Sequence, residues 1–182
     1  MLPKHKIVIS PIGVLNAEIV EHVRREITRI FSYQTEVVPL LEEVLFAFDQ
    51  QRNQFHSTSI LEKLSAIAPA DAAKVLAITS VDLFIPILTH VYGEAQLGGK
   101  ACVISTYRLD EDLPSLSGNR VLLERAGKEA VHEMGHTFSL RHCKDSTCIM
   151  HYCRTIKDVD RKSEQLCRYC AVMLEDEKKR IG

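Results

Sequence analysis

The stretch VHEMGHTFSLRHC, residues 131–143, decides how the rest of this sequence is read. It contains the pattern H-E-x-x-H, with His132, Glu133 and His136 in the three named positions. Residues four apart lie one above the other on a helix face, so both imidazoles can reach one metal ion. Zinc accepts histidine nitrogens at about 2.0–2.1 Å, and a carboxylate beside the first histidine can approach a water on the metal. The stretch therefore predicts a helix with two zinc ligands and an adjacent acid.

A third ligand is expected at His142, because metallopeptidase sites commonly use three protein ligands and a water. In a continuous helix this residue would lie about 9 Å beyond His136 along the axis, so the chain must turn after about residue 138. The extended motif H-E-x-x-H-x-x-G-x-x-H has glycine at this turn, whereas this sequence has Ser139. We expect Ser139 to adopt the left-handed conformation, at a cost of roughly 1–2 kcal/mol. The alternative is a slightly different turn with looser zinc binding.

Three imidazoles, one acid and a metal predict hydrolysis. Zinc lowers the pKa of its bound water toward about 7 and polarises a carbonyl group. Glu133 would take the proton from that water and pass it to the leaving amine. The pattern thus predicts a zinc-dependent metallopeptidase, of endopeptidase or aminopeptidase type, that hydrolyses peptide bonds via zinc-bound water and a glutamate general base. Two alternatives stay open: a catalytically silent, zinc-stabilised binding protein, and a zinc hydrolase of another amide.

Cysteines near this stretch form a second candidate metal site. Cys143 and Cys148 have four residues between them, and Cys167 and Cys170 form C-x-x-C. Two such pairs can close a tetrahedral four-thiolate zinc site, which has no open position and is therefore structural. The alternatives are free buried thiols, or disulfides in an oxidising compartment. Cys153 is the main rival ligand.

The rest of the chain alternates strands and helices, an order typical of parallel crossover units. Polar residues 49–58 and 109–119 are predicted loops, with Ser57 or Ser59 as the N-cap of the helix that follows the first of them. Cys102 lies in a predicted core strand and is interpreted as a buried thiol. The predicted strands are residues 6–12, 34–41, 73–79, 87–92 and 100–107, and the predicted helices are 16–31, about 57–68, about 119–138 and about 168–179. The remaining histidines, interpreted as surface or satisfied side chains, are His5, His22, His56, His90 and His151.

The composition limits the partners of the chain. Its 182 residues are 46% hydrophobic and 26% charged, as in a single soluble globular domain. A net charge of −1 gives no electrostatic case for nucleic acid or acidic membranes. The sequence shows no stretch suited to spanning a bilayer, and the N-terminus MLPKHKIVIS does not resemble a signal peptide. We expect a cytoplasmic monomer that binds a peptide or protein substrate, with no nucleic acid and no membrane partner.

Residues 132–170 resemble the archaemetzincin family of metzincin zinc metallopeptidases. That family's pattern is H-E-x-x-H-x-x-G-x-x-H-C, then C-x-M, then C-x-x-C. This sequence supplies HEMGHTFSLRHC, then Cys148-Ile149-Met150, then CRYC, with Ser139 as the one departure. Upstream, the stretch YGEAQLGGKACVIST also resembles the edge-strand region of the family.

The resemblance implies two zinc ions per chain. The catalytic ion would be held by the three histidines and the structural ion by four cysteines. Met150 would be the methionine of the Met-turn, an apolar base beneath the histidines. The ligands implied are His132, His136 and His142 for the first ion and Cys143, Cys148, Cys167 and Cys170 for the second.

The resemblance also implies an α/β (α+β) class and a metzincin-like zincin fold. A mixed twisted sheet and the active-site helix would form an upper α/β subdomain, residues 1–141. A small lower subdomain, residues 142–182, would be Cys-rich and stapled by zinc, and the two would make one catalytic domain, 1–182. The edge strand at 91–96 would bind an extended peptide. This makes Gly93, Glu94 and Ala95 candidate substrate-binding residues.

Overall fold

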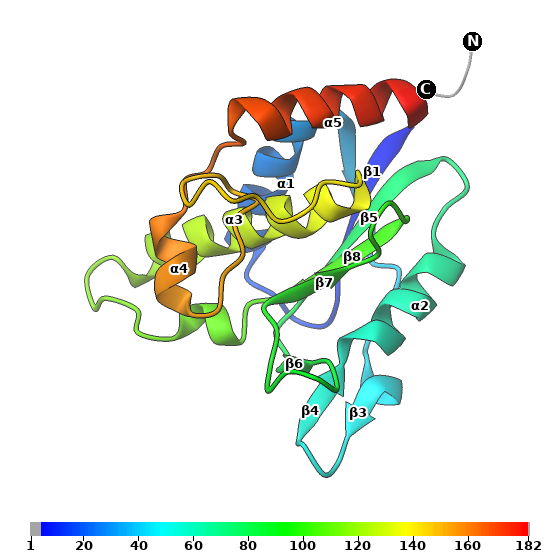
Figure 1. The fold of residues 1–182 in the computed structure, drawn as a ribbon. Coiled ribbons are helices and arrows are strands. Elements are labelled where there is room, and N and C mark those ends of the chain that lie inside the picture. The colour runs from blue at the N-terminus through cyan, green and yellow to red at the C-terminus, as the bar shows by residue number, and fades with distance from the viewer. Residues whose placement is uncertain (1–4, 182) are drawn as a thin grey trace.

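A computed structural model describes residues 5–181 of the chain. Residues 1–4 and 182, which are the two ends of the predicted domain 1–182, lie outside the described residues. Helices and strands alternate through most of the chain (Figure 1). The helices are α1 (Ala17–Phe31), α2 (Ser57–Ile67), α3 (Gly118–Thr137), α4 (Ile156–Arg161) and α5 (Arg168–Ile181), with 3₁₀ turns at Leu45–Ala47 and Arg108–Asp110. The strands are β1 (Lys6–Pro11), β2 (Gln34–Val37), β3 (Phe48–Asp49), β4 (Gln54–His56), β5 (Ala72–Thr79), β6 (Leu83–Phe84), β7 (Gly93–Ala95) and β8 (Ala101–Ser105).

The main sheet has the order β2-β1-β5-β8-β7. Neighbouring strands are parallel except β7, which runs antiparallel to β8 with Glu94 opposite Val103. The expected mixed sheet is therefore confirmed, and β7 forms its edge. A smaller sheet joins β3, β4 and β6.

Helices cover both faces of the main sheet. Successive strand residues point to opposite faces, so Ile7 and Ile9 of β1 pack in one core while Val8 packs in the other. The first core also takes residues of α1, α3 and α5, and the second takes those of α2. Figure 1 shows α1, α3 and α5 on one side of the sheet and α2 on the other. Burial on both faces explains why β5 reads as the nearly unbroken apolar run AAKVLAIT.

Three sequence-based predictions about local structure were wrong. Residues 87–92 form no strand: the amide of Leu88 donates to the carbonyl of Ile85 in a turn, Ile87 is exposed, and Val91 makes a single bridge to Leu83. The predicted loop 49–58 contains part of β3 and all of β4. These strands, of two and three residues, are too short to show an alternating pattern. Neither predicted serine caps α2: its N-cap is His56, and the hydroxyl of Ser57 donates instead to the carboxylate of Glu94. The short helix α4 was not predicted.

Among the described residues, no helix combines the length and apolar character that crossing a membrane requires.

Candidate metal centres and cleft

Helix α3 and the turn after it bring three histidines together. The ring centroids lie 4.7 Å apart for His132 and His136, 5.3 Å for His132 and His142, and 4.9 Å for His136 and His142. One nitrogen of each ring falls within 4.8 Å of the others. The Nε2 atoms of His132 and His136 are 3.1 Å apart. A tetrahedral zinc ion with bonds of about 2.0–2.1 Å needs nitrogens about 3.3–3.4 Å apart, so this donor set fits zinc.

Backbone carbonyls orient the first two rings. His132 Nδ1 lies 2.9 Å from the carbonyl of Ile149, and His136 Nδ1 lies 2.7 Å from that of Leu140. A carbonyl only accepts, so each Nδ1 carries the proton and each Nε2 keeps its lone pair for a metal. Burial lowers the pKa of both rings, most strongly that of His132. The neutral form, which is the metal-binding form, is therefore favoured.

The turn after α3 relies on Ser139 in the left-handed conformation. Its φ is +62°, as expected from the sequence. In this conformation the amides of Ser139 and Leu140 donate to the carbonyls of His136 and Gly135, which ends the helix and sends the chain back toward His142. The conformation costs a non-glycine residue roughly 1 kcal/mol or more.

We expect Ser139→Gly to stabilise the protein. Relief of the left-handed strain outweighs the greater entropy of glycine in the unfolded chain, leaving a net gain of about 0.5–1 kcal/mol. For a domain of this size the melting temperature would rise by about 1–4 °C. Thermal unfolding of the two proteins with metal saturating tests this, with Ser163→Gly in an exposed loop as the control. A lower melting temperature for Ser139→Gly would show that the serine turn is not strained.

Glu133 lies directly against the edge strand. A Cβ added at Gly93 would stand 2.7 Å from Cγ of Glu133 and 2.7 Å from the carbonyl oxygen of Val103, so only glycine lets β7 approach this closely. Burial raises the pKa of the Glu133 carboxyl well above its usual range, and the nearby Glu129 raises it further. A carboxyl held this way is a suitable proton acceptor near neutral pH, and a cation bound by the histidines would favour its ionised form.

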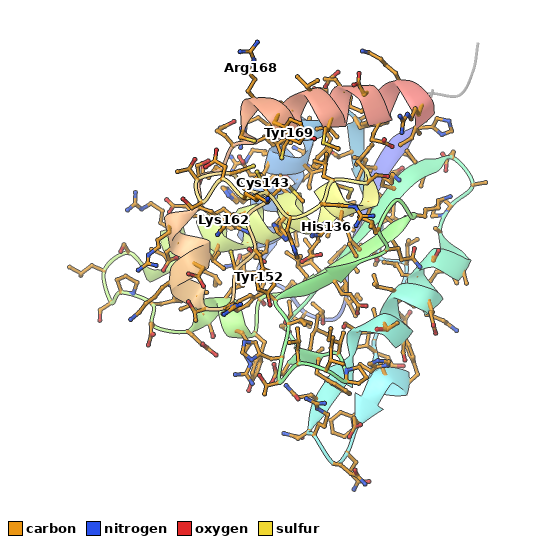
Figure 2. The ribbon with its side chains drawn as sticks, in the orientation of Figure 1. His136, Cys143, Tyr152, Lys162, Arg168 and Tyr169 are labelled. Carbon is orange, nitrogen blue, oxygen red and sulfur yellow. The ribbon has the colours of Figure 1, made fainter. Side chains whose placement is uncertain are left out.

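A buried ion pair stands beside this carboxyl. Lys162 follows α4 next to α3 (Figure 2), and its ammonium lies 2.6 Å from Oε1 of Glu129. Burial alone would lower the pKa of Lys162, but Glu129 and other nearby anionic groups outweigh this and raise it. The ammonium is 3.5 Å from Nδ1 of His132. The pair ties the segment after α4 to α3, one turn before Glu133.

Met150 lies beneath α3. It is fully buried, and its Sδ stands 2.5 Å from the position that a Cβ at Gly135 would occupy. Gly135 thus lets the sulfur approach the helix between His132 and His136. The residue before it, Ile149, supplies the carbonyl that orients His132.

The four cysteines of the second predicted site also converge. Their sulfurs lie within 4.8 Å of one another, and Sγ of Cys143 is 3.8 Å from Sγ of Cys167. A tetrahedral zinc with bonds of about 2.3 Å spaces its sulfurs about 3.8 Å apart, so this set also fits zinc. The amide of Cys170 faces the sulfur of Cys167 and lowers the pKa of its thiol, which favours the thiolate form that binds metal.

The other two cysteines lie outside this group. Cys153 contacts the carbonyl of His151, and burial raises the pKa of its thiol to about 11. Cys102 is fully buried in β8, and its pKa is likewise raised by burial.

A cleft of about 470 Å³ contains the three histidines and Glu133. One wall is formed by residues 88–95, including Gly93, Glu94 and Ala95 of β7, and the other by residues 152–154. The ring of Tyr152 lies 4.9 Å from that of His142. Figure 2 shows His136 and Tyr152 in the space between α3 and β7.

Sequence reasoning missed several residues of this cleft. Glu129 could have been found, since it lies one helical turn before Glu133 on the same face. Tyr152 and Arg154 of the lining, and the buried Lys162 that pairs with Glu129, carried no usable signal, because the segment after Met150 that contains them has no periodic pattern.

The fold and the paired histidine and cysteine sites define a zinc metallopeptidase of the metzincin class. The chain belongs to peptidase family M54, the archaemetzincins, whose family model matches residues 10–176. It is 36% identical to an archaemetzincin of Methanocaldococcus jannaschii over 172 residues, covering 94% of this chain and 93% of that protein.

Solved archaemetzincin structures share the fold. That of Methanopyrus kandleri superposes with a TM-score of 0.85 at 30% identity, covering 99% of this chain and 100% of the other. That of Archaeoglobus fulgidus, complexed with malonate, has a TM-score of 0.79 at 35% identity, covering 92% of this chain and 99% of the other.

Proposed function

We propose that this chain hydrolyses peptide bonds with Glu133 as general base and a zinc ion held by His132, His136 and His142. The convergence of three neutral imidazoles beside a buried carboxyl carries this proposal. Zinc bound there would supply Lewis acidity toward a water and a substrate carbonyl. Glu133 would accept the proton of the attacking water and deliver it to the leaving nitrogen. Whether the enzyme acts as an endopeptidase or an aminopeptidase stays open.

A second, structural zinc ion on Cys143, Cys148, Cys167 and Cys170 is part of the same proposal. The sulfur spacing supports it. Since Cys143 directly follows His142, this ion would also fix the approach of the third histidine. Met150 would act as the Met-turn residue, supported by its close contact with α3.

The substrate would bind as an added strand along β7. This strand is the edge of the main sheet and lines the cleft, which supports main-chain pairing with an extended peptide. Glu94 contributes by anchoring the strand: its carboxylate accepts hydrogen bonds from the hydroxyls of Ser57 and Thr58 in the first turn of α2. The expectations of a cytoplasmic monomer without nucleic-acid or membrane partners stay predictions.

The proposal is tested by cleavage of a mixed peptide library. We expect products with the zinc-loaded protein, loss of turnover after a chelator removes the histidine-bound metal, and recovery when zinc is restored. Absence of cleavage across the library with both sites loaded would favour a silent, zinc-stabilised binding protein.

Gly93→Ala is expected to reduce kcat/KM by about 100-fold, because displacing a catalytic group by about 1 Å has an effect of this size. The added methyl would push Glu133 away from the histidines, or β7 away from β8. Initial rates on the best library substrate measure this, and Gly118→Ala, which adds the same methyl at the start of α3 outside the cleft lining, is the control. Activity within threefold of the original protein would show that the close approach at Gly93 is unnecessary.

A further inference from the structure

The charges that line the cleft indicate which substrate side chains it would favour, an inference that rests on the proposed function. Three carboxyls line it, those of Glu94, Glu129 and Glu133, and one guanidinium, that of Arg154. Which of these charges is free to meet a substrate depends on the partners that each already has.

The carboxyls are already engaged. Glu94 accepts hydrogen bonds from the hydroxyls of Ser57 and Thr58, as described above. Glu129 is paired with the buried ammonium of Lys162. Glu133 is the general base of the proposed reaction. Glu129 is thus neutralised by a cation, and both oxygens of Glu94 already accept hydrogen bonds from α2.

The guanidinium of Arg154 is unengaged. Among residues 5–181 no carboxylate lies within 4.0 Å of it, and its side chain has no hydrogen-bond partner. Its main chain is nevertheless held, because its amide donates to the Asp158 carboxylate at 3.1 Å, within the capping box of α4. Arg125 is paired with Asp160 and Arg108 with Asp82. Among the described residues, Arg25, Arg141 and Arg168 also have no carboxylate partner, but of these unpaired arginines only Arg154 lines the cleft. The backbone of Arg154 is thus held in place on the cleft wall, while its guanidinium has no partner.

We propose that Arg154 is a specificity-determining residue that binds an acidic side chain, aspartate or glutamate, of the peptide near the bond to be cleaved. A guanidinium can donate two parallel N–H bonds to the two oxygens of a carboxylate. A glutamine side chain offers one acceptor oxygen and a lysine side chain offers none, so neither can accept this pair of bonds. The same charge disfavours a basic side chain at that position, so selection acts in both directions.

Binding of peptide hydroxamates to the zinc-loaded protein tests this without requiring turnover. Each probe carries a single glutamate, glutamine or lysine at one of three positions counted from the zinc-binding end. We expect one position at which glutamate binds about fivefold tighter than glutamine, the size of an exposed ion pair at its upper range. The preference should shrink as sodium chloride rises from 0.05 to 0.5 M.

Variants assign the preference to one residue. Arg154→Gln should remove it and Arg154→Glu should reverse it toward lysine, while both still bind the glutamine probe. Lys157→Gln, an exposed cation on α4 outside the cleft lining, should leave it unchanged. Equal binding of all probes, or a glutamate preference that survives in Arg154→Gln, overturns the proposal. Failure of every probe to bind contradicts the proposed catalytic site itself, and this inference with it.

Discussion

Glu133→Gln is expected to lower kcat by at least about 10³-fold on any peptide that the protein cleaves, near the upper range for loss of a general base. Glutamine has nearly the same shape, so it keeps the packing of this side chain against Gly93. It cannot accept the proton of an attacking water. Because Glu133 is not among the three clustered histidines, the metal content of the variant should not change. Steady-state rates and zinc content, measured on the same preparation, test both statements.

Glu124→Gln is the matched control, since Glu124 lies on α3 two turns before the motif and does not line the cleft. It should leave kcat within about twofold, as expected for a half-buried surface residue far from the site. Activity of Glu133→Gln within tenfold of the original would show that this carboxyl is not the general base. Loss of zinc in that variant would show instead that Glu133 helps to hold the metal.

Cys167→Ser is expected to lower the free energy of unfolding by at least about 3 kcal/mol, because structural zinc contributes its binding energy to folding. For a domain of this size that corresponds to a fall in melting temperature of at least about 6 °C. The sulfur of Cys167 contacts that of Cys143, and its carbonyl accepts from the amide of Ala171 in α5. Losing the ion would therefore release the last helix and the residue next to His142 together.

Thermal unfolding and zinc content check this prediction. Cys153→Ser, a part-buried cysteine outside the cluster, is the control and should retain both ions. If Cys167→Ser keeps two zinc ions and an unchanged melting temperature, the four-thiolate site does not exist in solution.

The grouping of the three histidines and of the four cysteines could be predicted from sequence because the spacing within each motif is local. His132 and His136 depend only on helix geometry, and C-x-x-C depends only on a turn. The conformation of Ser139 followed from the need to bring His142 back to the other two rings, and its φ of +62° confirms that reasoning.

Residues 93–95 of one cleft wall were predicted only through the family resemblance. Spacing and periodicity could not predict the contacts that form the cleft, because these contacts join distant segments. The contact of Gly93 with Glu133 joins residues 40 positions apart, and no composition or periodicity marks it. The pairing of Glu129 with Lys162 arises only when the loop after Met150 packs on α3. The strand wrongly predicted at 87–92 also depended on an apolar run alone. Such a run suggests burial, but in the folded chain Ile87 lies on the surface.

The most direct test is a crystal structure of the zinc-loaded protein with anomalous scattering recorded at the zinc edge. We predict two peaks per chain, one about 2.0–2.1 Å from a nitrogen of each of His132, His136 and His142, and one about 2.3 Å from four cysteine sulfurs. A zinc ion bound by only two of the three histidines, with His142 turned away, would contradict the account.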